Sequence, residues 1–144
     1  GCGSEHSNYI SQLRSGTPEQ RAQAASFLGA QRITKAIPQL LEALQDENVQ
    51  VRTKAIWALG MLRSKAGLKK MLPFMQDPDR DIRQATARAL MQIEEPGAIA
   101  MLESALKIEP DEWVVKDITA ALEHLRQFEG EADIGASSVR GEFF

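Results

Sequence analysis

A segment that recurs every 31 residues constrains this chain more than any other feature. Residues 46–60 open with acidic and capping residues and continue into an apolar helical pattern. The pattern returns at residues 77–91 and also occurs earlier, at residues 15–29. The aligned positions carry Arg21, Arg52 and Arg83, and then Leu28, Leu59 and Leu90. A repeat of this length indicates a solenoid, in which each unit buries its apolar face against its neighbours.

Short polar residues mark where one helix of each unit begins. They are Thr17, Asn48, Asp79 and, after a shift of one residue, Asp111. Their side chains accept hydrogen bonds from the free N–H groups of a first helical turn. Apolar residues then recur at the spacing of one buried stripe. The three clearest stripes are Val51, Ala55, Ala58, Leu59 and Leu62; Ile82, Thr86, Ala89, Leu90 and Ile93; and Val114, Ile118, Ala121, Leu122 and Leu125.

A second set of aligned segments lies between these helices, at residues 36–44, 67–75 and 98–106. Pro38 and Pro73 fall near the starts of their segments, where the missing N–H costs little or produces a bend. The loops are short, which favours antiparallel helix pairs. We therefore predict an all-α protein, an α-solenoid of about four antiparallel helix pairs. The repeat domain should cover residues 8–128, between a flexible N-terminus (1–7) and a flexible C-terminal tail (129–144).

The best-preserved parts of the repeat are an acidic turn, a Val/Ile–Arg pair and two small residues followed by Leu. They appear as Asp46, Val51, Arg52, Ala55, Ala58 and Leu59, and again as Asp77, Ile82, Arg83, Thr86, Ala89 and Leu90. With these residues the unit resembles the HEAT-repeat family, in the short HEAT-like form of phycobilisome lyases. The first and last units depart from the pattern, as terminal units of solenoids usually do. The resemblance implies that the turn Asp and the helix Arg bond each other or a neighbouring repeat, so we interpret Arg52 and Arg83 as structural.

Charge is distributed unevenly, although the net charge is only −3. Residues 50–91 carry nine Lys/Arg and three acidic residues, whereas residues 92–144 carry four Lys/Arg and twelve acidic residues. The basic middle raises nucleic-acid binding as an alternative function. The acidic C-terminal third would repel phosphate, and no basic stripe runs the full length, so nucleic acid is the weaker alternative. The chain has no apolar run of about 18 residues, so we expect no transmembrane segment.

Catalytic and metal-binding patterns are missing from the sequence. Cys2 is the single cysteine, which excludes an internal disulfide and a Cys-based metal cluster. His6 and His124 are far apart, and the chain has no Ser/His/Asp set and no phosphate-binding loop. We predict a non-enzymatic protein with no cofactor and no metal site. Residues 1–4 resemble the end of a bacterial lipoprotein signal. We expect a cytoplasmic protein, with lipidation of Cys2 and an envelope location as the alternative.

Trp57 is the largest departure from the repeat, since its equivalents are Ser26, Arg88 and Ala120. It lies off the buried stripe of its helix, on the side expected to form the inner, concave surface. Tryptophan is enriched among the residues that contribute most to binding, which favours a contact anchor. Alternatively, its ring packs across an adjacent helix or beneath the C-terminal tail.

The leading hypothesis is a scaffold that binds another protein on its concave face. The predicted contact residues are Trp57, Thr53, Lys54, Arg63, Gln84 and Arg88. An acidic or aromatic partner would fit, because three of these residues are basic. A lyase-like chaperone of a bound chromophore is a further alternative, which rests on the family resemblance alone. Trp113 occupies a position where other units have polar residues; we expect it to close the end of the core, with a second contact or tail docking as alternatives.

Overall fold

The structure is a computed structural model that describes the backbone of residues 2–141 and the side chains of residues 3–129. It is all-α, as predicted, and no strand occurs within residues 2–141. The α-helices are α1 (Cys2–Ser15), α2 (Pro18–Ala30), α3 (Ile37–Ala43), α4 (Val49–Met61), α5 (Leu68–Met71), α6 (Arg80–Ile93), α7 (Ile99–Ile108) and α8 (Glu112–Gly141). Short 3-10 segments are η1 (Thr34–Ala36), η2 (Lys65–Gly67), η3 (Leu72–Gln76) and η4 (Pro96–Ala98).

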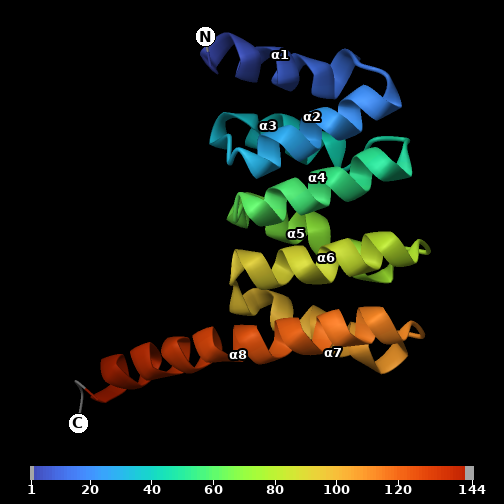
Figure 1. Cartoon of the computed structure of the whole chain (residues 1–144). Coiled ribbons are helices and arrows are strands. Elements are labelled where there is room, and N and C mark those ends of the chain that lie inside the picture. Colours follow the sequence, from blue (N-terminus) through green and yellow to red (C-terminus); the bar gives the residue numbers. More distant parts are fainter. Residues whose placement is uncertain (1, 142–144) are drawn as a thin grey trace.

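The helices form two rows (Figure 1). The second helices of the units, α2, α4, α6 and α8, lie one after another in the front row, with α3, α5 and α7 behind them. Neighbours in the front row contact each other far more extensively than neighbours in the rear row. The two-row stack confirms the predicted solenoid, and we call the front row the inner row because it corresponds to the surface that the sequence predicts to be concave.

The predicted capping residues begin their helices. Thr17 forms a reciprocal capping box with Gln20, and Asn48 accepts hydrogen bonds from the N–H groups of two first-turn residues. Asp79 and Asp111 accept equivalent bonds at the starts of α6 and α8. Each cap satisfies N–H groups that have no partner inside the helix, so the start of every second helix is fixed locally.

The predicted stripes form the core. Every member of the three stripes is buried except Leu62, which is half-buried. One buried cluster joins the first three units, and a second joins the last two. Thr86 is the polar member of its stripe, and its hydroxyl donates to the carbonyl oxygen of Ile82 at 2.7 Å. This bond satisfies the buried hydroxyl, so it can stay inside the apolar core.

Two glycines let the second helices approach closely. A Cβ built on Gly29 would lie 2.7 Å from the Cα of Ala58 on α4. A Cβ on Gly60 would lie 2.8 Å from the Cα of Ala89 on α6. Any larger residue would therefore collide with the backbone of the next helix. These glycines set the narrow spacing of the inner row.

The structure differs from the sequence prediction in three segments. Helix α1 begins at Cys2, within the predicted flexible residues 1–7, because the rings of His6 and Tyr9 lie against Phe27 of α2. Helix α8 continues through Gly141, within the segment predicted to be a tail. Residues 142–144 of that tail lie outside the described residues. Pro73 divides its predicted helix into α5 and η3.

Candidate partner-binding groove

A groove of about 320 Å³ lies between α4 and α6 on the inner row of helices. Its lining residues from α4 are Val49, Gln50, Thr53, Lys54 and Trp57. Those from α6 and its cap are Asp79, Asp81, Gln84, Ala85, Arg88, Ala89 and Gln92. The small side chains of Ala85 and Ala89 leave the space that the larger residues surround. The groove is lined by both apolar and polar side chains, the composition of a site for a side chain of a ligand.

Trp57 packs across an adjacent helix, which was one of the predicted alternatives, and it also borders the groove. Its side chain is half-buried and packs against the core of the first three units. The ring reaches α2, since its Cζ3 would lie 3.0 Å from a Cβ on Gly29. The same side chain lines the groove on the α6 side. A ring fixed by packing on one side presents its other side to a ligand at little cost in conformational entropy.

The groove lining carries two basic and two acidic side chains, Lys54, Arg88, Asp79 and Asp81. Asp79 is occupied as the helix cap, and Asp81 pairs with Arg80 at 2.9 Å. Among the described residues, Lys54 has no ion-pair partner within 4 Å. Arg88 is 59% exposed and bonds Asp117 through its Nε alone. Its remaining N–H groups and the Lys54 ammonium can therefore donate hydrogen bonds to a ligand.

Five of the six predicted contact residues lie in this one groove: Trp57, Thr53, Lys54, Gln84 and Arg88. The structure does not bring Arg63 there. Arg63 lies in the turn after α4, with a φ of 52°, and its guanidinium pairs with Glu94 at 3.0 Å. The sequence prediction missed the α6 wall at Ala85, Ala89 and Gln92, because it considered each helix face separately. The repeat register could have predicted this wall, since adjacent units bring equivalent helix faces together.

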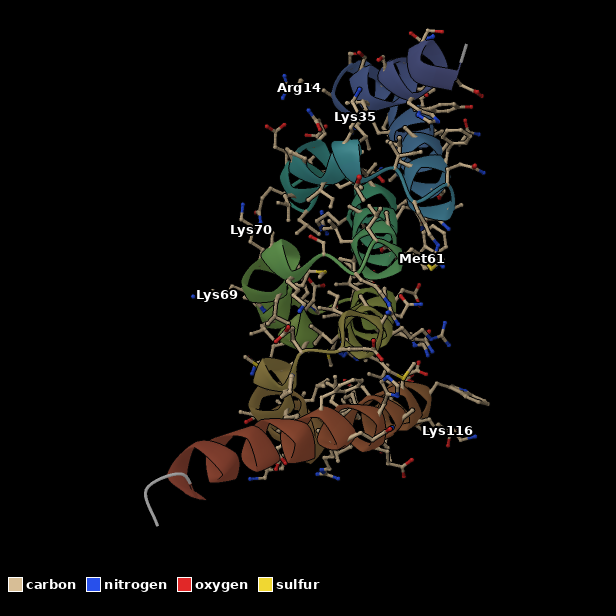
Figure 2. All side chains as sticks on the ribbon, turned by 90° about the vertical axis from the view of Figure 1, so that its left-hand side faces the viewer. Arg14, Lys35, Met61, Lys69, Lys70 and Lys116 are labelled. Atoms are coloured by element: carbon tan, nitrogen blue, oxygen red, sulfur yellow. The ribbon has the colours of Figure 1, made fainter. Side chains whose placement is uncertain are left out.

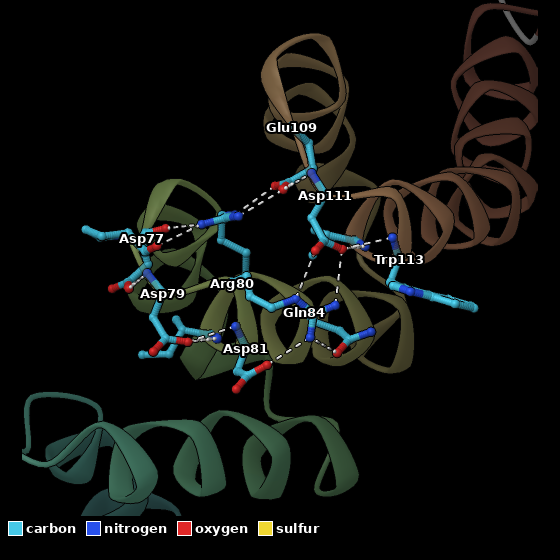
Figure 3. A network of polar contacts seen from close by, with 12 residues as sticks. Asp77, Asp79, Arg80, Asp81, Gln84, Glu109, Asp111 and Trp113 are labelled. Carbon is cyan, nitrogen blue, oxygen red and sulfur yellow. Dashed lines mark hydrogen bonds and ion pairs between the residues drawn. The ribbon is translucent and has the colours of Figure 1, made fainter.

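Gln84 is held in position by a polar network at the start of α6 and α8 (Figure 3). Arg80 donates to the side-chain oxygen of Gln84 at 3.3 Å and to both carboxylate oxygens of Asp111 at 3.1 Å. The Arg80 guanidinium and the N–H groups of the first turn of α8 lower the pKa of Asp111 to about 2. Asp111 is therefore ionised at neutral pH, and the network connects the groove to the last unit.

The aligned arginines are structural, as the resemblance implied. Arg21 bonds both carboxylate oxygens of Asp46 in the next unit, at 2.8 and 3.0 Å. Burial alone would raise the pKa of Asp46, but the bonds from Arg21 and a backbone N–H lower it overall. Arg83 bonds Glu109 of the next unit in the same way and also donates to carbonyl oxygens of its own turn. Arg52 donates only to such carbonyl oxygens. The contacts of Arg21 and Arg83 join successive units, and those of Arg52 stabilise its own turn.

Neither a metal site nor a membrane-spanning helix is found in the described part of the chain. Within those residues no group of three or more His, Cys, Asp or Glu is placed to hold a metal ion. None of the described helices has both the length and the apolar character needed to span a membrane.

Comparisons with known proteins agree with this architecture. In Nostoc sp. PCC7120, a chain from the complex of CpcE and CpcF of phycocyanin lyase is similar over 81% of this chain, with 23% identity and a TM-score of 0.70. An engineered protein is similar over 83% of this chain, with 21% identity and a TM-score of 0.67. This chain spans 53% and 61% of those two chains, and at these identities the likeness shows the fold alone.

The comparison with curated proteins gives no match. The family model for HEAT repeats matches twice, over residues 8–74 and 50–123. Together these matches cover the two central units and extend into the atypical first and last units. The chain therefore belongs to the HEAT-repeat family.

Proposed function

We propose that this protein is an interaction scaffold that binds an acidic or aromatic segment of another protein in the groove between α4 and α6. The observation that carries the proposal is the convergence of five predicted contact residues on one groove. HEAT repeats supply extended inner surfaces that suit this use. The half-buried Trp57 would provide the apolar contact, and Lys54 and Arg88 would bond carboxylate groups of the partner.

The distribution of basic residues favours a protein partner over nucleic acid. Lys69 and Lys70 extend from the first-helix side of the stack (Figure 2), whereas Lys54 and Arg88 line the groove between the second helices α4 and α6. Nucleic acid is usually bound by basic residues that form one continuous patch along the phosphate backbone. Here the basic residues of the middle units are divided between two sides, and Arg88 pairs partly with Asp117.

Substitutions in the groove should weaken partner capture without unfolding the protein. We expect Trp57→Ala and Arg88→Glu each to reduce the amount of partner retained in pull-downs about 30-fold. This corresponds to about 2 kcal/mol, the usual loss at a binding hot spot. Circular dichroism should show unchanged helicity.

Lys69→Glu is the matched control, because it makes the same kind of charge change on the other side of the stack. The Lys69→Glu variant should retain as much partner in pull-downs as the wild-type protein does. If both groove variants also retain the partner fully, a protein partner does not bind in this groove.

A role alongside a chromophore lyase is the second candidate, favoured by the structural similarity to a chain of the CpcE–CpcF complex. In that case the bound partner would be a further subunit or a protein that carries the chromophore. A visible absorption band in the protein purified from its source would support this candidate. If the partner carries no chromophore, as the first proposal allows, we expect no such band.

A further inference from the structure

Two α6 side chains of the groove also have polar contacts with the last unit. Gln84 and Arg88 both line the groove between α4 and α6. They are four residues apart, so they lie one turn apart on the same face of the helix. Helix α6 lies between α4 and α8 (Figure 1), and hydrogen bonds join these two side chains to α8 and its cap. The last unit therefore contacts the groove from outside, since none of its described residues lines it.

Asp117 of α8 holds Arg88 directly. Its Oδ2 accepts a hydrogen bond from the Nε of Arg88 at 3.1 Å, and the carboxylate side chain is only 22% exposed. The Arg88 side chain is mostly exposed, so without this bond its guanidinium would sample several rotamers. A bond through Nε leaves the N–H groups of both Nη atoms available to a ligand.

Asp111, the cap of α8, holds Gln84 through Arg80. Each carboxylate oxygen of Asp111 accepts a hydrogen bond from Arg80 at 3.1 Å, and Arg80 donates to the side-chain oxygen of Gln84 at 3.3 Å (Figure 3). Because the amide oxygen of Gln84 is occupied, its NH2 group is left to donate to a ligand. Arg80 and Asp111 do not line the groove, so they act on it through Gln84.

The repeat register explains why the two sides of α6 differ. Counted from the capping residues of their helices, Asp117 is equivalent to Ala85, and Arg88 is equivalent to Trp57. Between α6 and α8 these positions hold the ion pair of Arg88 with Asp117. Between α4 and α6 they hold Trp57 and the small Ala85, which leave the groove open. Helix α6 thus has an open groove on one side and polar supports for its groove residues on the other.

We propose that Asp117 and Asp111 are positioning residues of the groove. They hold Arg88 and Gln84 as two fixed hydrogen-bond donors one helical turn apart. These donors select a partner segment that offers two acceptor oxygens at a matching spacing. Donors that are fixed before binding lose little conformational entropy when the ligand binds. This inference rests on the proposed function and adds the residues of the last unit that set the specificity of the groove.

Peptides selected from a phage-displayed random library on the immobilised full chain provide the probe. Only peptides whose binding is lost with Trp57→Ala are kept, because these occupy the groove. Fluorescence anisotropy should show that Asp117→Ala and Asp111→Asn each weaken their binding about fivefold, although neither residue lines the groove. Asp117→Asn keeps an acceptor oxygen for Arg88, so its loss should be smaller than that of Asp117→Ala.

Double-mutant cycles separate positioning from a general effect of charge. In a protein that already carries Arg88→Ala, Asp117→Ala should cause no further loss, because the residue through which it acts is gone. In a protein that carries Gln84→Ala, Asp111→Asn should likewise cause none. A long-range effect of the removed negative charge would persist in both backgrounds and would overturn the proposal.

Two control variants change α8 without touching these contacts. Glu112→Gln removes a negative charge from the exposed first turn of α8 and should leave peptide binding unchanged. Trp113→Ala should also leave it unchanged. Trp113 is 55% exposed and does not line the groove, so it does not close the end of the core as its sequence position suggested.

Urea unfolding separates loss of contact from loss of fold. Asp117→Ala should keep the wild-type midpoint, because an ion pair with an exposed arginine contributes little to stability. Asp111→Asn should keep the cap of α8, since asparagine is as good a cap as aspartate and Asn48 caps α4 in the same chain.

The possible results distinguish the two proposals. If Asp117→Ala and Asp111→Asn bind the Trp57-dependent peptides as the wild-type protein does, the positioning roles are wrong and the proposed groove stands. If no selected peptide depends on Trp57, both proposals are overturned.

Discussion

Arg83→Ala should lower the free energy of unfolding by about 3–5 kcal/mol, the usual loss when one partner of a buried ion pair is removed. The side chain of Glu109 is only 2% exposed, and that of Arg83 is 13% exposed. Two hydrogen bonds, at 2.8 and 3.0 Å, join the guanidinium to this carboxylate. Without Arg83, the buried carboxylate keeps only the backbone N–H of Asp111 as a donor, and two carbonyl oxygens lose the donor that Arg83 supplied. Urea unfolding followed by circular dichroism measures the loss.

Arg52→Ala is the matched control from the preceding unit. Arg52 occupies the aligned position but donates only to the carbonyl oxygens of Asp46 and Glu47. Its removal should cost about 1 kcal/mol, because no charged partner is left unpaired. The double variant Arg83→Ala/Glu109→Ala should recover part of the loss. Equal effects of Arg83→Ala and Arg52→Ala would show that the pair with Glu109 adds nothing.

Gly60→Val should lower the free energy of unfolding by about 3 kcal/mol, at the upper end for overpacking of a core. A Cβ at this position would lie 2.8 Å from the Cα of Ala89 and 2.6 Å from the Oε1 of Gln92. The Gln92 side chain can rotate away, but the backbone of α6 has to move. Thermal and urea unfolding should both show the loss.

The same substitution should also change the groove, because Ala89 and Gln92 belong to its α6 wall. Gly97→Ala is the control, since its Cβ would meet only the Cδ2 of Leu68 at an ordinary 3.7 Å. Its stability should stay within about 0.5 kcal/mol of the wild-type value. A Gly60→Val protein of wild-type stability would contradict the close packing of α4 on α6.

Features that depend on neighbouring residues could be predicted from the sequence. The caps at Asn48 and Asp79 act on N–H groups two or three residues away, so a short polar residue before an apolar stripe was sufficient. The stripes repeat at 31 residues, so a burial pattern in one unit predicted the others. The repeat also predicted that Trp57 lies on the inner row, because its helix is a second helix of a unit.

Features that depend on contacts between units could not be predicted. Glu109 replaces the turn Asp after a shift of one residue, so its pair with Arg83 had no aligned counterpart. The exposure of Trp113 depends on whether another helix covers the start of α8, and none of the described helices does. The C-terminal part of α8 has no repeat equivalent, so its helical extension to Gly141 was also missed.

Site-specific photo-crosslinking tests most directly whether the groove between α4 and α6 binds a partner protein. A photoreactive phenylalanine analogue is placed at Gln84 in the groove or, as the control, at Lys69 on the first-helix side. After irradiation in cells of the source, we expect one protein to be crosslinked from position 84 and not from position 69, and Trp57→Ala to reduce that product. A partner crosslinked from position 69 but not from position 84 would contradict binding in the groove.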